Sequence, residues 1–228
     1  MKVVCFDLDD TLYKEIDYLK SAYREIASYA AQMCTVTSVP VDVLEVKAYE
    51  VMLEAYRDDK NAFEVLNEYL RLDLPLSDML QMYREHKPEI SLDEETRLTL
   101  NRLKADGVLM GIVSDGRELT QWNKVKALDL IEWMDESCII INSSTECFKP
   151  NPFGYERFLS AVKTLSKDKE WSFTYVGDNL KKDFIWPKRN GWHTICLKDD
   201  GRNIHKQVLE NTPVEAFPDK VIESIKEL

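Results

Sequence analysis

The stretch Val3-Val4-Cys5-Phe6-Asp7-Leu8-Asp9-Asp10-Thr11 begins with four consecutive apolar residues and ends in a cluster of carboxylates. A short, unbroken apolar run is typical of a strand in a parallel sheet that is covered on both faces. Ligands of open α/β sheets bind outside the carboxyl ends of the strands. The sequence therefore predicts a buried first strand whose end delivers Asp7 and Asp9 to a binding crevice.

Further apolar runs bounded by turn residues occur later in the chain, at residues 108–113, 138–141, 173–176 and 194–197. Between two of them, Phe158, Leu159, Val162 and Leu165 have the spacing of one helical face. Strands that alternate with helices indicate right-handed crossover units. The fold class expected from this pattern is α/β, with a parallel sheet between helices.

Residues 14–90 break this alternation. Apolar stripes with helical spacing lie at residues 18–30, 44–55, 63–70 and 76–83, and the breaks between them fall at Pro40, residues 58–60 and Pro75. Helices that merely flank the sheet are an alternative, but four in succession without a strand are unusual in a doubly wound domain. We therefore expect an all-helical subdomain over 14–90, inserted into an α/β core formed by 1–13 and 91–228.

Composition excludes several classes of protein. The 228 residues are 44% hydrophobic, which is enough for a folded core, and their net charge of −11 disfavours broad binding to nucleic acid or an anionic membrane. The apolar start of the chain is too short for a signal peptide or a membrane span, so a cytoplasmic location is expected. Five dispersed cysteines and three histidines argue against a zinc or disulfide framework; Cys5, Cys138 and Cys196 are expected to be reduced and buried.

A second acidic cluster follows the apolar run at residues 173–176. It reads Gly177-Asp178-Asn179-Leu180-Lys181-Lys182-Asp183. Asp178 or Asn179 could simply cap a following helix. However, acids gathered at the ends of two buried strands repel one another unless a cation relieves them. With so little histidine available, a hard, oxygen-liganded ion such as Mg²⁺ is the expected counter-ion.

Two further segments carry candidate phosphate ligands. The run Gly111-Ile112-Val113-Ser114-Asp115-Gly116 ends in a hydroxyl and a turn glycine, so Ser114 and nearby backbone N–H groups could donate to phosphate oxygens. An ordinary serine turn is the alternative. Lys149 lies between Phe148 and Pro150, which would fix its backbone and aim its ammonium group. A solvated loop lysine is the alternative.

These four segments, in this order, resemble the haloacid dehalogenase superfamily. Its members carry a DxDxT motif, a strand-end Ser or Thr, a Lys before Pro and a GDxxxxD motif, all of which have counterparts here. The helical insertion after the first motif resembles the small helical cap subclass. The resemblance implies a Rossmann-like core sheet and an active site between core and cap.

The resemblance also implies residue roles. Asp7 corresponds to the nucleophile that takes up a phosphoryl group, and Asp9 to the acid/base. The metal ligands would be Asp7, the backbone carbonyl of Asp9, and Asp178, with Asp183 holding a metal-bound water. A carboxylate can attack phosphorus only if the negative charges are offset, which Mg²⁺ and Lys149 would do.

Thr11, Ser114, Gly116 and Lys149 are expected to bind the phosphorylated substrate. Thr11 is also expected to stiffen the first loop through side-chain hydrogen bonds. One departure is Asp115, where relatives often have Asn. An extra carboxylate near a phosphate is repulsive unless it binds backbone, so it receives no substrate role. Whether Arg117 faces the site is left open.

The resemblance implies hydrolysis of a small phosphorylated metabolite. Dehalogenase members lack an acid two positions after the nucleophile, whereas Asp9 is present here, which favours phosphoryl chemistry. A phosphomutase would use the same residues. A phosphorylatable signalling or scaffold protein is less consistent with Asp9, because a positioned base should shorten the life of an aspartyl phosphate. The sequence predicts neither the substrate nor the oligomeric state.

Overall fold

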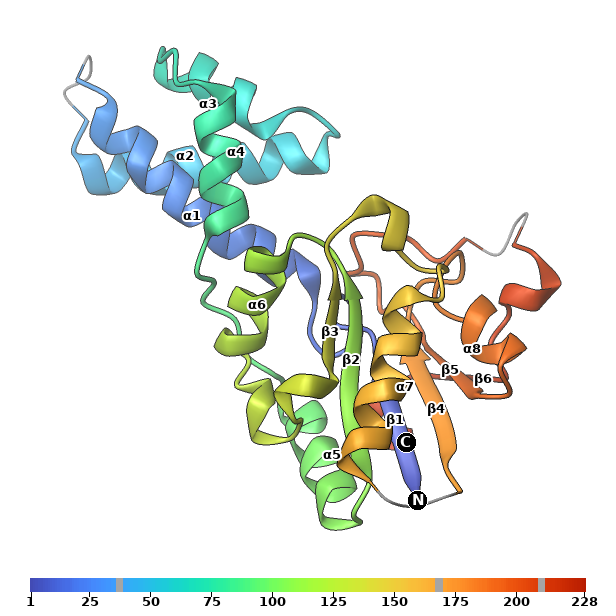
Figure 1. The fold of residues 1–228 in the computed structure, drawn as a ribbon. Coiled ribbons are helices and arrows are strands. Elements are labelled where there is room, and N and C mark those ends of the chain that lie inside the picture. Colours follow the sequence, from blue (N-terminus) through green and yellow to red (C-terminus); the bar gives the residue numbers. More distant parts are fainter. Residues whose placement is uncertain (36–38, 167–169, 209–211) are drawn as a thin grey trace. The chain divides into compact units, whose positions relative to one another are not determined.

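The chain divides into two units, which are traced in Figure 1. The computed structural model describes residues 1–35, 39–166, 170–208 and 212–228, so three short segments within the predicted core and cap ranges lie outside it. One unit comprises Met1–Ile16 and Ser91–Leu228, and the other comprises Asp17–Ile90.

The first unit is built on a parallel sheet. Its strands are β1 (Lys2–Phe6), β2 (Leu109–Asp115), β3 (Ile139–Asn142), β4 (Ser172–Gly177), β5 (His193–Leu197) and β6 (Lys220–Ile222). They lie in the order β3-β2-β1-β4-β5-β6, and every neighbouring pair is parallel. This is the strand order of a Rossmann-like, doubly wound sheet, so the predicted fold class is confirmed.

Strand β1 lies at the point in the sheet where the strand order reverses: β2 and β3 lie on one side of it, and β4, β5 and β6 lie on the other. It pairs with β2 on one edge, where Val3 lies opposite Leu109, and with β4 on the other, where Val3 lies opposite Phe173. The chain thus winds to one side of β1 first and to the other side later. Ligands of such sheets bind at this switch point, outside the carboxyl ends of the strands. The fold therefore directs attention to the residues that follow β1 and β4.

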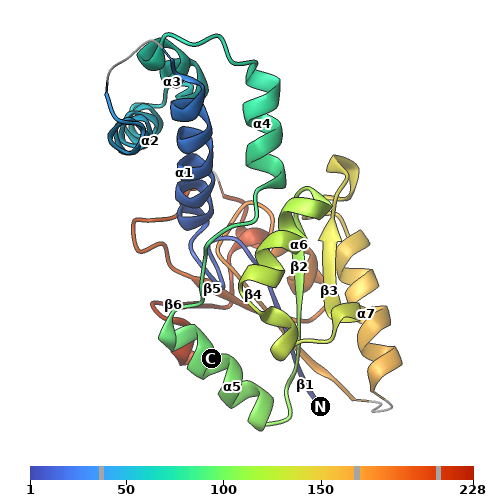
Figure 2. The same ribbon diagram turned by 90° about the vertical axis from the view of Figure 1, so that its left-hand side faces the viewer.

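Helices cover both faces of the sheet (Figures 1 and 2). Helices α7 (Phe153–Leu165) and α8 (Ile185–Arg189) lie on one side, and α5 (Glu94–Ala105) and α6 (Glu118–Ala127) lie on the other. Phe158 and Val162, from the predicted helical stripe, are fully buried against the sheet. Tyr155 stacks on Trp186 with 4.8 Å between ring centroids, so an aromatic layer fills the space under α7 and α8.

The second unit is all helical in its described residues. It contains α2 (Val41–Arg57), α3 (Ala62–Leu70), α4 (Leu76–Glu85) and most of α1 (Glu15–Met33). Pro40 and Pro75 immediately precede α2 and α4, and the Asn61 side chain caps α3 by accepting from two backbone amides. These helices fall on the four predicted segments, with buried apolar faces that include Ile26 and Leu66.

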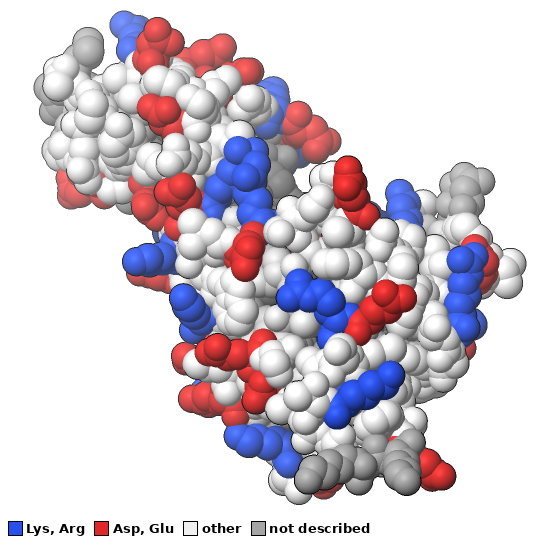
Figure 3. All heavy atoms as spheres, viewed as in Figure 1, with Lys and Arg blue, Asp and Glu red and all other residues white. Residues whose placement is uncertain are grey.

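The surface carries mixed charges on one face (Figure 3), and the three cysteines are buried as predicted. Figure 3 shows a face of the first unit on which Lys and Arg side chains are interspersed with Asp and Glu side chains. Cys5, Cys138 and Cys196 are buried and reduced. Among the described residues, none of the helices is both long enough and apolar enough to cross a bilayer.

Candidate active site

Polar side chains from several strand ends meet at the carboxyl edge of the sheet. Asp7 follows β1, and its backbone N–H donates to the Val176 carbonyl at 2.8 Å, which continues the pairing with β4. Asp178 follows β4, and Ser114 lies near the end of β2. With Asp9, these residues line a small cleft of about 80 Å³. The structure therefore brings together carboxylates from both acidic clusters and the predicted serine.

Asp7 is held in a defined orientation inside the protein. Its side chain is almost fully buried, and Oδ1 accepts from the Leu8 amide at 2.8 Å. The same oxygen lies 2.8 Å from Lys149 Nζ. Burial raises the pKa of Asp7 to about 6, against the opposing effect of the Lys149 charge. The contacts on Oδ1 leave Oδ2 as the oxygen available to a reacting group.

Lys149 is a buried cation that joins the two acidic clusters. Its side chain is 0% exposed, and Nζ lies 2.8 Å from Asp7 Oδ1 and 2.8 Å from Asp183 Oδ1. It also donates to the Tyr175 hydroxyl at 3.0 Å. Burial alone would lower the pKa of Lys149, but Asp183 and Asp7 raise it well above its ordinary value. The alternative of a solvated loop lysine is therefore wrong.

Asp183 shapes the loop that carries Asp178. Its Oδ2 accepts from the backbone amides of Asp178, at 3.2 Å, and Asn179, at 2.8 Å. A Cβ at Gly177 would lie only 2.5 Å from Asp183 Oδ2, so a larger residue at this position would displace the carboxylate. Asn203 then donates to Asp178 Oδ2 at 3.0 Å. Asp178 is thus held at two points, by Asp183 through its backbone amide and by Asn203 through its carboxylate.

Three of these carboxylates form a group that could hold a metal ion. One oxygen each from Asp7, Asp178 and Asp183 lies within 4.8 Å of the others, and all three residues are buried. Burial raises the pKa of Asp178 to about 9, and the charges of Asp183 and Asp7 add to this effect. Clustered acids of this kind are relieved by a cation, and carboxylate oxygens suit a hard divalent ion. The donor set therefore fits the predicted class of metal.

Asp9 has different surroundings, because its side chain is turned toward α6. Oδ1 accepts from the Tyr13 hydroxyl at 2.6 Å and lies 2.7 Å from Lys124 Nζ, while Oδ2 accepts from Gln121 Nε2 at 2.8 Å. Burial by itself would raise the pKa of Asp9, but the Lys124 charge and these hydrogen bonds bring it below its ordinary value. The pKa values of Asp7 and Asp9 are therefore shifted in opposite directions, although the two residues are only two positions apart.

Asp115, the departure from the family pattern, serves the neighbouring loop. Its Oδ1 accepts from the Lys149 backbone amide at 3.1 Å and from Asn142 Nδ2 at 2.9 Å. Its Oδ2 pairs with Lys182 Nζ at 3.1 Å. The Asp115 carboxylate thus binds backbone, which agrees with giving it no contact to substrate. It also holds the segment that carries Lys149 in place.

Of the other predicted phosphate ligands, Ser114 lines the cleft and Gly116 does not. Ser114 is buried and its Oγ accepts from Gln121 Nε2 at 2.7 Å. The Gly116 amide donates to the Asn142 carbonyl at 3.0 Å, so the N–H predicted to bind phosphate is already used. Arg117 is exposed and does not line the cleft.

The loop-stiffening role predicted for Thr11 is wrong. Its hydroxyl is buried without a hydrogen-bond partner among the described residues, so it does not stiffen the loop in this way. The neighbouring Asp10 does so instead. It adopts a left-handed conformation with φ of 58°, and its carboxylate accepts from the amides of Glu15, at 3.0 Å, and Ile204, at 2.9 Å.

The comparison with protein families settles the membership of the chain. A family model described as haloacid dehalogenase-like hydrolase matches residues 4–197, a range that includes both acidic clusters, Ser114 and Lys149. The chain belongs to the haloacid dehalogenase-like hydrolases. The resemblance drawn from its four motifs is confirmed.

Individual relatives agree with this membership. A protein named glyceraldehyde 3-phosphate phosphatase from Pyrococcus furiosus is 30% identical over 207 residues, covering 87% of this chain and 81% of the relative. A crystal structure of a phosphatase of the family from Thermococcus onnurineus has a TM-score of 0.55 at 22% identity, covering 100% and 95% of the two chains. A putative beta-phosphoglucomutase from Thermotoga maritima has a TM-score of 0.60 at 17% identity, covering 100% and 96%. The two structures support the fold alone.

Several residues of the candidate site were not predicted from sequence. Gln121 and Lys124 contact Asp9 from α6, Tyr13 donates to it from the first loop, and Asn203 donates to Asp178. The available signal was the spacing of Gln121 and Lys124, which places two polar residues on one helical face. Nothing in the local sequence marks that face as buried.

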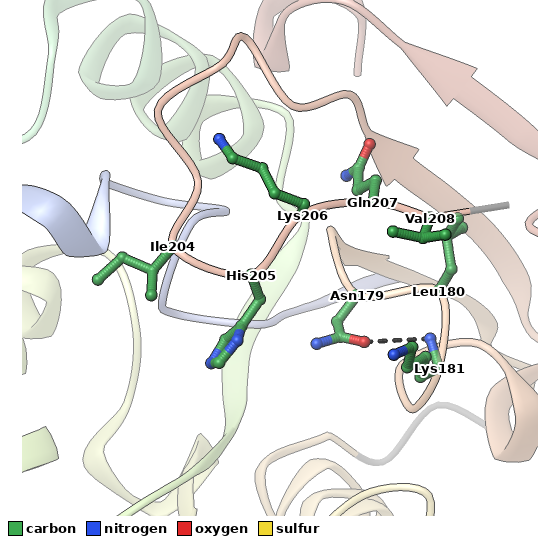
Figure 4. Close-up of a pocket in the computed structure, with 8 residues that line it drawn as sticks. All are labelled: Asn179, Leu180, Lys181, Ile204, His205, Lys206, Gln207 and Val208. Atoms are coloured by element: carbon green, nitrogen blue, oxygen red, sulfur yellow. Dashed lines mark hydrogen bonds between the residues drawn. The ribbon is translucent and has the colours of Figure 1, made fainter. Parts of the chain in front are cut away.

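A second pocket of about 210 Å³ lies beside the site, between residues 179–181 and 204–208 (Figure 4). The side chains that line it do not converge on a common point. The side chains of His205 and Lys206 extend to opposite sides of their loop in Figure 4, and Lys206 Nζ donates to the Gly201 carbonyl at 2.9 Å. We therefore assign the chemistry to the cleft lined by Asp7 and Asp178.

The raised carboxyl pKa values predict how pH affects the metal-free protein. Burial raises the pKa of Asp7 to about 6, of Asp178 to about 9 and of Glu15 to about 8, all above their unfolded values near 4. The contribution of these groups to the free energy of unfolding is fully present below about pH 4. It is lost as the pH rises through their pKa values in the folded state. In chelator, the melting temperature should fall by about 5 °C or more between pH 5 and 8.

Added Mg²⁺ should reduce this fall, because a bound cation relieves the ionised carboxylates. Asp178→Asn, which removes one ionisable group, should also flatten the pH dependence in chelator. A melting temperature that rises from pH 5 to pH 8 in the metal-free wild-type protein would contradict the assignment of these pKa shifts.

Proposed function

We propose that this chain hydrolyses a small phosphomonoester through an aspartyl phosphate formed on Asp7, with Mg²⁺ as cofactor. The observation that carries this proposal is the contrast between Asp7 and Asp9. Asp7 lies beside Lys149 and the acidic group, whereas Asp9 is held separately by donors from α6 and the first loop. This separate placement lets Asp7 attack phosphorus beside the positive charges of Lys149 and the bound metal, while Asp9 is held apart to exchange a proton.

In the first step, Asp7 Oδ2 attacks phosphorus and the bond between phosphorus and the ester oxygen breaks. Asp9 gives its proton to the leaving oxygen, and the product alcohol departs. Because Lys124 and its other donors favour the ionised form of Asp9, the proton that it transfers must arrive with the bound substrate or from solvent. Lys149 offsets the negative charge that gathers around Asp7.

In the second step, Asp9 accepts a proton from water as that water attacks phosphorus. The bond between phosphorus and Asp7 breaks, and inorganic phosphate leaves with the carboxylate restored. This reverse use of one group as acid and then base balances the protons over the cycle. Ser114, whose hydroxyl lies near the end of β2, would donate to a phosphoryl oxygen in both steps.

Mg²⁺ bound by Asp7, Asp178 and the backbone carbonyl of Asp9 would supply positive charge against the phosphoryl oxygens. We assign Asp183 a supporting role, because its Oδ2 already binds the amides of Asp178 and Asn179. We also propose that the helical unit provides substrate selectivity, as predicted for a cap.

The test is release of inorganic phosphate from a panel of phosphorylated metabolites in Mg²⁺, without a bisphosphate primer. Glyceraldehyde 3-phosphate is the first compound to try, because the Pyrococcus furiosus relative bears that name. We expect steady release from at least one compound and loss of activity in excess chelator, restored by Mg²⁺. Activity that needs a primer would favour a phosphomutase, and full activity in chelator would contradict the metal-dependent mechanism.

A further inference from the structure

Helix α6 presents two buried polar side chains to the candidate site. Gln121 is 2% exposed and Lys124 is 3% exposed. They lie three residues apart and so share one face of the helix. Fully buried lysine is rare without a charged partner, because desolvation of its ammonium group is costly. The partners of these two side chains are therefore informative about function.

Lys124 fixes one oxygen of Asp9. Its Nζ lies 2.7 Å from Asp9 Oδ1, and the Tyr13 hydroxyl donates to the same oxygen at 2.6 Å. Glu15 Oε1 lies 3.6 Å from Lys124 Nζ and balances part of its charge. With two donors on Oδ1, the acceptor capacity that remains on this carboxylate is mainly on Oδ2. Lys124 and Tyr13 thereby hold Oδ1 in place and leave Oδ2 for other contacts.

Gln121 links Asp9 to the predicted phosphate ligand. Its Nε2 donates to Asp9 Oδ2 at 2.8 Å and to Ser114 Oγ at 2.7 Å, and the Asp115 carbonyl is a longer third contact at 3.4 Å. Since the Ser114 oxygen accepts from Gln121, its own hydrogen is left for another acceptor. A Cβ at Gly116 would lie 3.0 Å from the Gln121 side chain, so the absence of a side chain there makes room for this arrangement.

We propose that Gln121 and Lys124 are positioning residues that set Asp9 and Ser114 for phosphoryl transfer. Lys124 aligns Asp9 for proton transfer to the leaving oxygen, and Gln121 directs the Ser114 hydroxyl hydrogen toward a phosphoryl oxygen. This inference rests on the proposed phosphatase function. The competing explanation is that the two side chains only stabilise the buried end of α6.

Dependence on the leaving group separates these explanations for Lys124. An alkyl phosphate needs a proton on its leaving oxygen, whereas 4-nitrophenyl phosphate has a good leaving group and needs little acid assistance. Lys124→Met should lower kcat/KM for alkyl phosphates at least about tenfold more than for 4-nitrophenyl phosphate. Asp9→Asn should show the same pattern, and the double variant should add little to it. Lys126→Met, at an exposed site on the same helix, is the control that should match wild type.

The ratio of the two rates is measured in one sample, so partial unfolding of Lys124→Met does not affect it. Lys124→Arg, which retains the charge, should restore part of the ratio. Equal losses on both kinds of substrate, or no loss on either, would overturn the role of Lys124 while leaving the proposed function intact. A wild-type protein inactive on every phosphomonoester would instead overturn the proposed function, and this inference with it.

Gln121→Glu tests the second half of the proposal with almost no change in side-chain volume. A carboxylate cannot donate to Ser114 or Asp9, so the Ser114 hydrogen should turn toward Glu and away from phosphate. We expect the inhibition constant of inorganic phosphate to rise about tenfold, and Ser114→Ala in the same background should have little further effect. Unchanged inhibition by phosphate in a folded Gln121→Glu variant would overturn the assignment of Gln121.

Discussion

Asp7→Asn is expected to abolish turnover of any phosphomonoester that the wild-type protein hydrolyses. The amide oxygen is a poor nucleophile, and Asp183, the other carboxylate beside Lys149, is already bound through Oδ2 to the backbone amides of Asp178 and Asn179. Loss of a covalent nucleophile typically lowers kcat by orders of magnitude, so we expect a fall of at least about ten-thousandfold. Steady-state phosphate release measures the loss, and circular dichroism verifies that the variant is folded.

Two companion variants make this prediction specific. Asp106→Asn makes the same chemical change at an exposed position and should retain wild-type turnover. Asp9→Asn should slow turnover and allow a phosphoenzyme to accumulate, which acid-quenched samples with labelled substrate would detect. Turnover by Asp7→Asn within about tenfold of wild type would remove the nucleophile assignment, whatever the behaviour of Asp9→Asn.

Lys149→Met is expected to reduce turnover at least about a hundredfold. The substitution keeps most of the side-chain volume but removes the charge that lies 2.8 Å from both Asp7 and Asp183. Removal of one preorganised electrostatic partner raises a reaction barrier by roughly 3 to 4 kcal/mol in other enzymes, and about 1.4 kcal/mol corresponds to each factor of ten. Steady-state kinetics at saturating substrate and Mg²⁺ provide the measurement.

Loss of a buried charge also threatens folding, so stability is measured alongside activity. Lys149→Arg should rescue poorly, because a planar guanidinium cannot reproduce the position of a compact ammonium group between two carboxylates. Lys163→Met, at an exposed position on α7, should be neutral in both assays. If Lys149→Met were folded and active within about threefold of wild type, the charge would have no catalytic role.

The sequence was most informative where buried segments are continuously apolar. The runs that became β1 to β5 are covered on both faces, so they carry no alternation and stand out from their surroundings. Strand β6 (Lys220–Ile222) was missed because it is a short edge strand in which Lys220 and Val221 are exposed. An edge strand of three residues leaves almost no pattern in the sequence.

The site was predictable only in part, for a related reason. Asp7 and Asp178 are marked by the strands that precede them, and Lys149 by its prolines. Lys124 has no such mark, since its partner Asp9 lies 115 residues away and a lysine on a helix is ordinarily solvated.

Two predicted loop contacts, those of Thr11 and Gly116, were wrong for a different reason. The hydroxyl of Thr11 was expected to brace the first loop, but the neighbouring carboxylate of Asp10 does so, with acceptors for two amides where Thr11 has one hydroxyl. The amide of Gly116 was expected to face phosphate, but it bonds across to β3. In such a loop, the backbone angles decide which of several adjacent polar groups forms a given hydrogen bond. Residue types alone do not determine those angles.

The position of β1 in the sheet has a consequence for the order in which the protein can assemble during synthesis. This strand is synthesised before both of its neighbours, β2 and β4, which end at residues 115 and 177. Contacts among α1 to α4 need only residues 15–85, so helical structure can form while β1 still has no partner. At about 5 to 20 residues per second, the strand that precedes Asp7 waits roughly 9 to 34 seconds for β4. The carboxylates of Asp7 and Asp178 can thus meet only after residue 178 has been synthesised.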